Sequence, residues 1–296
     1  MNKRQRTLTG LAFISPWIIG FLVFMAYPVI MSGYYSFCDY NVLNPPVWIA
    51  GRNYTDMAKD PIFWQTIYNT AYYAALALPL GLAVSLGIAL LLNTNVRGMA
   101  VYRTIYFIPS LVPMVALAIL WLWIFNSDHG LLNQALEPGL KLVHKTAPEW
   151  LTSPSWGKPA LVIASLWGVG NTIVIYLAGL QDVPQSLYEA AEIDGAGWLA
   201  RTWHVTIPML SPVILFNLIM GIIGTLQVFA VPYVMFGDGA PAHSNYFYTM
   251  YLYDNAFVYL KMGYACAMGW IMFFVIMGLS LLALKLSARH VYYGGS

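Results

Sequence analysis

Six long intervals of this 296-residue chain contain no Asp, Glu, Lys or Arg, and they constrain the fold more than any other feature. The intervals cover residues 7–38, 61–96, 104–127, 159–181, 202–237 and 262–284. A transmembrane helix needs about 20 mainly apolar residues, and a charged side chain at its centre costs about 2.5–3.5 kcal/mol. Only 9% of the residues are charged, against roughly 25% in soluble domains. The sequence therefore predicts an all-α polytopic membrane protein with six transmembrane helices.

Some of these intervals are longer than a span requires, so we place the apolar cores inside them. The predicted spans cover residues 11–37, 72–92, 104–127, 159–181, 210–235 and 262–284, in a single transmembrane domain over residues 1–296. The basic start MNKRQR precedes a long apolar run without a small-residue cleavage site, so we expect a retained first span rather than a signal peptide. Cys38 and Cys266 are too few for a disulfide framework and are expected to be unpaired.

The lysines and arginines between the spans predict the orientation. With six spans both termini share one side, and a cytoplasmic placement puts eight basic residues inside: Lys3, Arg4, Arg6, Arg97, Arg103, Arg201, Lys285 and Arg289. Six lie outside: Arg52, Lys59, Lys141, Lys145, Lys158 and Lys261. Because cytoplasmic connections are enriched in Lys and Arg, we expect cytoplasmic N- and C-termini. The net charge of +2 gives no indication of a nucleic-acid partner.

One polar segment, residues 182–208, connects two predicted spans on the cytoplasmic side and has helix signals at both ends. Its strings DVPQ and SLYE each place a capping side chain before a Gln or Glu, which is typical of a helix start. They predict a short helix over 184–194, ended by Gly195 and Gly197, which can adopt left-handed backbone conformations. A second helical piece is expected over 198–206.

The first of these helices carries two adjacent alanines, Ala190 and Ala191, which leave a flat surface that another protein can approach closely. Glu189 has two interpretations, because its side chain can face a partner or can close a capping box with Ser186. Gly195 can likewise be an ordinary helix terminator. The residues alone leave a docking surface and a well-terminated loop both open.

A longer pattern runs through this segment: EAA at 189–191, Gly195 after three further residues, and then VTIP ending in Ile207 and Pro208. It resembles the EAA signature of ABC-importer permeases, which reads EAA, three residues, Gly, nine residues and I-x-L-P, with Val and Ile here replacing Ile and Leu. Other segments, such as SPWIIGFLVFMAYPVI and RTIYFIPSLVP, are similar to the carbohydrate-uptake class of maltose- and glycerol-phosphate-type permeases. The resemblance covers nearly the whole chain.

The resemblance implies a type I importer permease in the plasma membrane of a bacterium or archaeon, translocating a sugar. Such a subunit is not an enzyme and has no cofactor or metal. It works as a heterodimer with a second permease, with two cytoplasmic ATPase subunits that hydrolyse ATP, and with an extracytoplasmic solute-binding protein. The coupling residues carried over are Glu189, which accepts a hydrogen bond from a basic ATPase residue, Ala190 and Ala191, which seat the helix, Gly195 at the corner, and Ile207 and Pro208.

Polar and aromatic side chains within the predicted spans are the candidates for the solute pathway: Trp167, Asn171, Asn217, Gln227 and Phe229. Polar residues inside spans usually face the bundle, and a polyhydroxylated solute requires amide hydrogen bonds beside aromatic faces. Interhelical packing explains the same residues equally well, so both interpretations stay open.

Other functions fit the sequence less well. The chain lacks the G-x-x-x-x-G-K-[ST] pattern, so it does not bind ATP through a P-loop, and it lacks the H-E-x-x-H of metalloproteases. An ion-coupled secondary carrier also needs a helical bundle, but such carriers commonly hold ionisable residues within their spans. The six predicted spans of this chain contain no Asp, Glu, Lys or Arg. Within the importers, glycerol phosphate or another polar solute remains the alternative to a sugar.

Overall fold

The computed structural model describes residues 3–94, 96–142, 146–237, 239, 241–288 and 291. Two basic residues used in the orientation argument, Lys145 and Arg289, lie outside the described residues. The cytoplasmic placement of the termini stays a prediction, because the helices alone do not define the two sides of a membrane. Both cysteines are free thiols, as expected.

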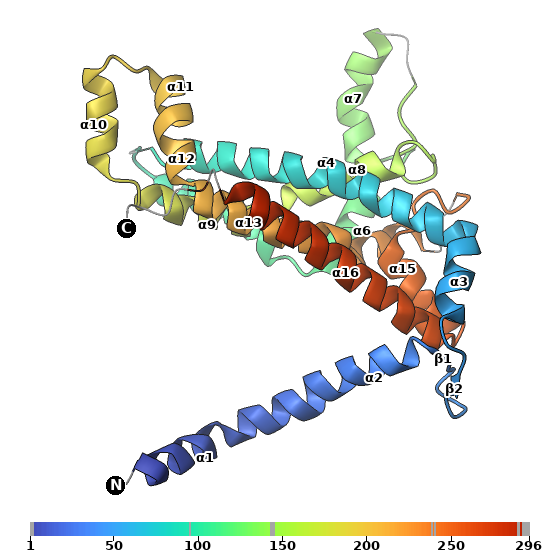
Figure 1. Ribbon diagram of the computed structural model, residues 1–296. Coiled ribbons are helices and arrows are strands. Elements are labelled where there is room, and N and C mark those ends of the chain that lie inside the picture. The colour runs from blue at the N-terminus through green and yellow to red at the C-terminus, as the bar shows by residue number, and fades with distance from the viewer. Residues whose placement is uncertain are drawn as a thin grey trace. The chain divides into compact units, whose positions relative to one another are not determined.

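The described chain is mainly helical (Figure 1). The first helices are α1 (Lys3–Phe21), α2 (Tyr27–Tyr35), α3 (Arg52–Lys59), α4 (Pro61–Leu92), α5 (Met99–Phe107), α6 (Met114–Ile124) and α7 (Leu131–Leu142). They are followed by α8 (Gly157–Trp167), α9 (Gly170–Gln181), α10 (Gln185–Ile193), α11 (Trp198–Arg201), α12 (Ile207–Met209), α13 (Ser211–Leu226), α14 (Ala230–Phe236), α15 (Tyr248–Tyr253) and α16 (Met262–Ser287).

Short irregular turns link several of these helices. Three are π-helical, namely η1 (Leu22–Ala26), η3 (Thr202–Thr206) and η4 (Asp254–Val258), and η2 (Ile108–Leu111) is a 3-10 turn. Two strands, β1 (Cys38–Asp39) and β2 (Val47–Trp48), pair antiparallel with Cys38 opposite Trp48.

Four helical segments are long and apolar enough to span a membrane: Thr9–Tyr35, Pro61–Leu92, Ser211–Phe236 and Met262–Ser287. They correspond to the predicted spans at 11–37, 72–92, 210–235 and 262–284. α4 begins 11 residues before the predicted apolar core, because the preceding stretch PIFWQTIYNT is also helical.

The predicted spans at 104–127 and 159–181 are each a pair of helices with a bend. The first pair, Met99–Leu111 and Met114–Ile124, bends by 97°, and the second, α8 and α9, by 47°. At the first bend Val112 precedes Pro113 and has an extended backbone, because a proline ring disfavours the helical conformation of the residue before it. Counting each pair as one span, the described residues hold up to six.

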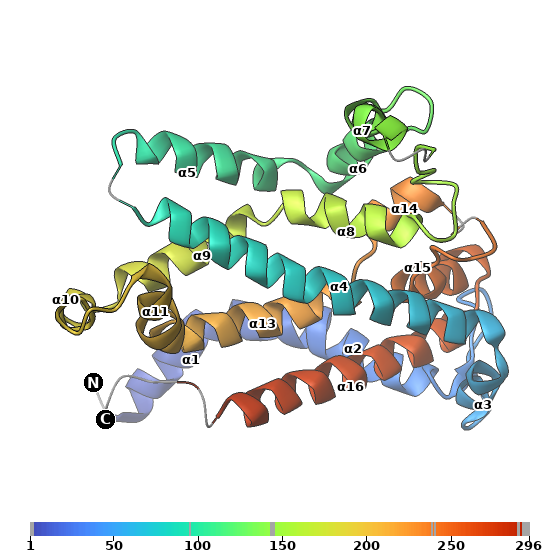
Figure 2. The same cartoon turned by 90° about the horizontal axis from the view of Figure 1, so that it is seen from above.

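Contacts divide the chain into two compact units, of which unit 2 comprises Pro61–Met250 and Val275–Ser296. Within unit 2, α4 packs along α8 and α9 and also along α13 (Figure 2). Near the C-terminal end of α4 lies a buried apolar cluster, which we call the hinge cluster: Ala89, Leu92, Ile173, Tyr176, Leu177, Leu180 and Leu210. It joins α4, the end of α9 and the residue that precedes α13.

Unit 1 comprises Met1–Asp60 and Tyr251–Phe274. Its loops are held by buried polar contacts, since the Asn53 amide donates 2.9 Å hydrogen bonds to the carbonyl oxygens of Ser36 and Cys38. Gly263, at the start of α16, donates its N–H to the Tyr40 carbonyl oxygen at 3.0 Å. These contacts fix the β-hairpin loop against α3 and the start of α16.

Candidate functional site

The polar segment 182–208 forms a helical hairpin that projects beyond the ends of α9 and α13 (Figure 1). We call it the coupling hairpin, after the role that the EAA resemblance implies for this segment. Its first leg is α10, and its second leg is the continuous run of α11, η3 and α12. The helices predicted over 184–194 and 198–206 are therefore confirmed.

The corner between the legs is built around Gly195. This residue has a left-handed backbone, with φ of +75°, as predicted. Its N–H donates to the Glu192 carbonyl oxygen at 3.0 Å, and the Ala196 N–H donates to that of Ala191 at 2.9 Å. This pair of bonds is the Schellman arrangement that satisfies the last carbonyls of a helix. The same prediction for Gly197 is wrong, because Gly197 has φ of −69° and precedes the first residue of α11.

The predicted capping boxes are also wrong. Pro184 precedes the first residue of α10, and no described side chain caps this helix. The turn is closed by the Leu187 N–H, which donates to the Pro184 carbonyl oxygen at 3.1 Å. The carboxylate of Glu189 makes no hydrogen bond or ion pair among the described residues, and its side chain is exposed. The capping explanation for Glu189 is thereby removed.

Four exposed residues share the outer face of α10 at helical spacing: Ser186, Glu189, Ala190 and Ile193. Ile193 is 87% exposed although it is a large apolar residue. The face thus combines a carboxylate, a flat alanine surface and an apolar side chain, while Ala191 is half-buried. Ile193 was not among the residues predicted from the sequence, although its position four residues after Glu189 places it on the same face.

Two side-chain hydrogen bonds connect the two legs in the part of the chain that the structure describes. The hydroxyls of Tyr188 and Thr206 share a hydrogen bond of 3.1 Å. Nearer the corner, the Arg201 guanidinium donates to the Glu192 carboxylate at 2.6 Å. The two acidic residues of the EAAE string therefore differ, because Glu192 is paired inside the hairpin and Glu189 is not.

The end of the signature connects the hairpin to the core of unit 2. Ile207 is half-buried and its N–H bonds to the Thr202 carbonyl oxygen across the π turn. Pro208 is exposed in the first turn of α12, where a missing N–H is tolerated. Two residues later, Leu210 is fully buried in the hinge cluster.

Two of the five solute-pathway candidates, Asn171 and Asn217, line one hollow of about 370 Å³ in unit 2. The hollow lies among α4, α8, α9 and α13, and its other polar side chains are Tyr73, Ser165, Thr172 and Thr225. Asn217 is buried, and its amide nitrogen has no hydrogen-bond partner among the described residues. Folding thus brings two of the five candidates together at one hollow, and their role in binding a solute stays a prediction.

The other three candidates lie away from the lining of this hollow. Trp167 packs edge-on against Trp121, with ring centroids 6.2 Å apart. Gln227 is exposed at the C-terminal end of α13, and Phe229 stacks on Tyr233 in the break between α13 and α14. The sequence placed all five within spans, but only the fold separates them by environment.

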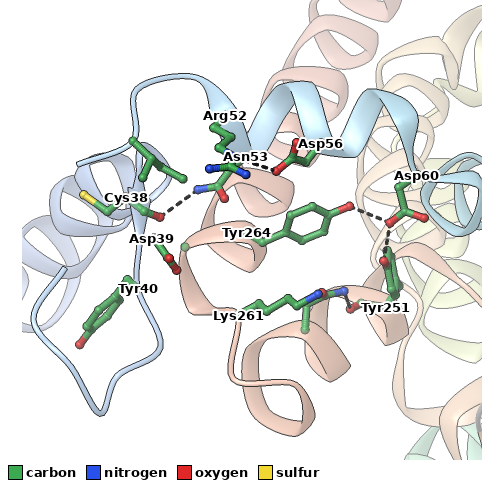
Figure 3. Close-up of a pocket in the computed structure, with 13 residues that line it drawn as sticks. Cys38, Asp39, Tyr40, Arg52, Asn53, Asp56, Asp60, Tyr251, Lys261 and Tyr264 are labelled. Carbon is green, nitrogen blue, oxygen red and sulfur yellow. Dashed lines mark hydrogen bonds and ion pairs between the residues drawn. The ribbon is translucent and has the colours of Figure 1, made fainter. Parts of the chain in front are cut away.

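A polar pocket of about 420 Å³ in unit 1 was not found from the sequence (Figure 3). The Asp60 carboxylate accepts hydrogen bonds from the hydroxyls of Tyr251 and of Tyr264, the latter at 2.9 Å. Burial, together with the bond to Asp60, raises the pKa of Tyr251 to about 12. The lining residues come from 38–60 and 251–264, which only folding brings together.

Comparison with the sequences of known proteins places the chain in a family. Residues 64–291 match the family described as binding-protein-dependent transport system inner membrane component. The probable ABC transporter permease protein YesP of Bacillus subtilis is 38% identical over 293 residues, covering 98% of this chain and 94% of YesP. The sulfoquinovosyl glycerol transport system permease protein SmoG of Agrobacterium fabrum is 33% identical over 283 residues, covering 94% and 90%.

A solved structure shares the fold. It is a chain of the bacterial alginate ABC transporter in complex with alginate pentasaccharide-bound periplasmic protein, with a TM-score of 0.85, 23% identity and 98% of each chain covered. Together with the apolar helices of this chain, these matches identify a multi-pass membrane protein. The chain therefore belongs to the binding-protein-dependent transport system inner membrane components, the permeases of ABC importers.

Proposed function

We propose that this chain is the permease subunit of a sugar importer, driven by ATP that separate cytoplasmic ATPase subunits hydrolyse. The observation that carries the proposal is the exposed carboxylate of Glu189 on the outer face of α10, which has no partner among the described residues. It lies in a signature that resembles the coupling segment of this family. A second permease and an extracytoplasmic binding protein complete the proposed assembly.

In this proposal the outer face of α10 docks on the ATPase. Glu189 accepts a charge-assisted hydrogen bond from a basic ATPase residue, and such bonds are among the stronger ones in proteins. Ala190 permits close approach of the two backbones, and Ile193 enters an apolar depression. The half-buried Ala191 supports α10 from the side of the hairpin.

Movement of the docked hairpin then reaches the membrane domain through its two ends. Leu180, at the end of α9, and Leu210, before α13, are both buried in the hinge cluster. Closure of the two ATPases on ATP moves these helix ends, and the bundle changes from inward-facing to outward-facing by rigid-body motion.

The proposed solute is a sugar, supported by the names of related permeases. The relative SmoG belongs to a sulfoquinovosyl glycerol transport system, and the chain of similar fold belongs to an alginate transporter. Asn171 and Asn217 are proposed to bind solute hydroxyls in the hollow of unit 2. Trp167, Gln227 and Phe229 stay proposals for other parts of the pathway.

The assembly is tested by purifying the complex through an affinity tag on this chain, expressed in its own host. Mass spectrometry should identify an ATPase, a second permease and a binding protein with its bound solute. A glycerol phosphate or another non-sugar solute on that binding protein would overturn the sugar assignment, and absence of an ATPase would overturn the importer assignment.

The docking role is tested with Glu189→Lys and Glu189→Gln. Loss of one charge-assisted hydrogen bond costs about 1.5–3 kcal/mol, so ATPase affinity should fall roughly tenfold to a hundredfold for Gln and further for Lys. Glu137→Lys on α7, also an exposed helical glutamate, is the control and should leave affinity unchanged. Unchanged affinity in both Glu189 variants would contradict the docking role.

A further inference from the structure

We infer that Tyr188, Glu192, Arg201 and Thr206 are positioning residues that brace the coupling hairpin, so that its two legs move as one body. None of the four belongs to the coupling residues taken from the EAA signature. The inference rests on the proposed function, because bracing of the legs matters only if the ATPase docks on α10 and displaces it. It concerns how a displacement of α10 is transmitted to α13.

The two cross-links lie at different heights of the hairpin. Tyr188 is adjacent to Glu189, but it points inward to Thr206, five residues before Ser211, where α13 begins. Glu192 and Arg201 connect the legs near the Gly195 corner. Two separated cross-links and a hydrogen-bonded corner prevent both spreading and twisting of the legs, whereas the corner alone would leave a hinge.

The hydroxyl pair has a defined geometry. Thr206 is 3% exposed, and its Oγ1 lies 3.4 Å from the Arg201 carbonyl oxygen, to which it donates. The Tyr188 hydroxyl lies 3.1 Å from Thr206 Oγ1, and either hydroxyl of the pair can donate. The π turn η3 makes this possible, because its wider turn places Thr202 and Thr206 inward while Trp203 stays exposed.

The charged pair has the geometry of a specific contact. Its N–O distance is 2.6 Å, and the Arg201 side chain is 28% exposed against 65% for Glu192. An exposed pair contributes little to global stability. Its effect is on the angle between the legs, since a salt bridge nine residues apart in sequence closes the corner from the inside. Glu192 is thereby occupied within the chain, and Glu189 is left for the partner.

The cross-links also explain the different environments of neighbouring residues on α10. Residues 186, 189, 190 and 193 form the exposed outer face, whereas Tyr188 and Ala191 are half-buried toward the second leg. One short helix thus presents one face to a partner and another to its own second leg. A displacement of the outer face is therefore transmitted through the hydrogen bond between Tyr188 and Thr206 to the second leg, and from there to α13.

The charged pair is tested by a charge swap in the complex purified from its own host. Glu192→Arg and Arg201→Glu, each alone, place like charges together and should lower the ATPase affinity and the stimulation of ATP hydrolysis by the binding protein. The double variant restores an opposite-charge pair and should recover both. If Glu192 instead contacts the ATPase, the double variant will fail to recover, and the brace is overturned.

The hydroxyl pair is tested by Tyr188→Phe, with Tyr102→Phe as the matched control. Tyr102 is an exposed tyrosine on α5 whose hydroxyl has no hydrogen-bond partner among the described residues. Loss of one hydrogen bond should raise the population of opened hairpins by roughly two- to tenfold. Spin labels at Gln185 and Leu199, one on each leg, measure the distance between the legs. A larger opened population gives a broader distribution of this distance.

The label experiment keeps the brace distinct from the docking proposal. It is performed on the complex with ATP and vanadate, after both native cysteines are replaced by alanine. A broad distribution in Tyr188→Phe, with the ATPase still bound, supports the brace. A distribution as narrow as in the Tyr102→Phe control refutes it. Failure of the unaltered chain to retain an ATPase would instead overturn the proposed function.

Discussion

The corner of the coupling hairpin gives the sharpest prediction, because the chain contains a matched pair of glycines two residues apart. Gly195 has φ of +75°, whereas Gly197 has φ of −69°. At either position an added Cβ would have no neighbouring heavy atom within 4 Å. Substitution by alanine therefore changes only the backbone preference. The expected effects of the two substitutions on the stability of the corner have opposite signs.

The magnitude follows from the backbone. A left-handed conformation costs an L-residue roughly 1–2 kcal/mol, so Gly195→Ala should shift the corner toward other conformations by roughly 5- to 30-fold. Gly197→Ala fits its native conformation and should be neutral or stabilising by about 0.4–1 kcal/mol. Gly195→Asn should be intermediate, since Asn tolerates the left-handed region better than Ala.

The assay is the equilibrium affinity of the purified permease complex for its ATPase, with thermal unfolding of the complex measured in parallel. The expected order of affinity is unaltered chain and Gly197→Ala first, then Gly195→Asn, then Gly195→Ala. Equal losses at positions 195 and 197 would refute the reasoning, because the corner would then not depend on the left-handed residue. A lower unfolding temperature without a change in affinity would assign Gly195 to stability alone.

Three further predictions concern the membrane domain and the pocket of unit 1. Asn171→Ala and Gln227→Ala should lower solute uptake while the ATPase still assembles; if neither variant changes uptake or solute range, these residues only pack helices. Gly263→Ala should lower the unfolding temperature of the complex, because the new Cβ would clash with the Cys38 carbonyl oxygen, and an unchanged temperature would contradict this packing. The raised pKa of Tyr251, about 12, means that the folded chain holds this proton more tightly than the unfolded chain. Its contribution to stability is complete below about pH 10 and is lost as the pH rises through about 12, so Tyr251→Phe should flatten that alkaline loss in thermal unfolding.

Features encoded by neighbouring residues were predictable from the sequence. The charge-free intervals predicted the membrane segments. The left-handed conformation of Gly195 was predicted from its position directly after the helix expected over 184–194. The capping boxes failed although their pattern was present, because Pro184 takes the position before the helix and a backbone turn closes it. A short capping pattern does not decide between side-chain and backbone closure.

Features that depend on distant residues were not predictable. Asn171 and Asn217 are 46 positions apart and share one hollow only because α9 and α13 both pack beside α4. The cross-links of the hairpin have the same origin, since Tyr188 and Thr206 are 18 positions apart and no local pattern pairs them. Hydroxyl and amide residues in spans carry no signal that separates a pathway from packing.

In the proposed mechanism, the hinge cluster determines which helices respond to the coupling hairpin. Leu180 and Leu210, at the two ends of the hairpin, pack in one buried cluster with Ala89 and Leu92 of α4. A close-packed cluster transmits displacement rather than absorbing it. In the proposed mechanism, a displacement of α10 therefore acts on the end of α4 as well as on α9 and α13. These three helices also line the hollow with Asn171 and Asn217, so we expect movement of the hairpin to change the shape of the hollow.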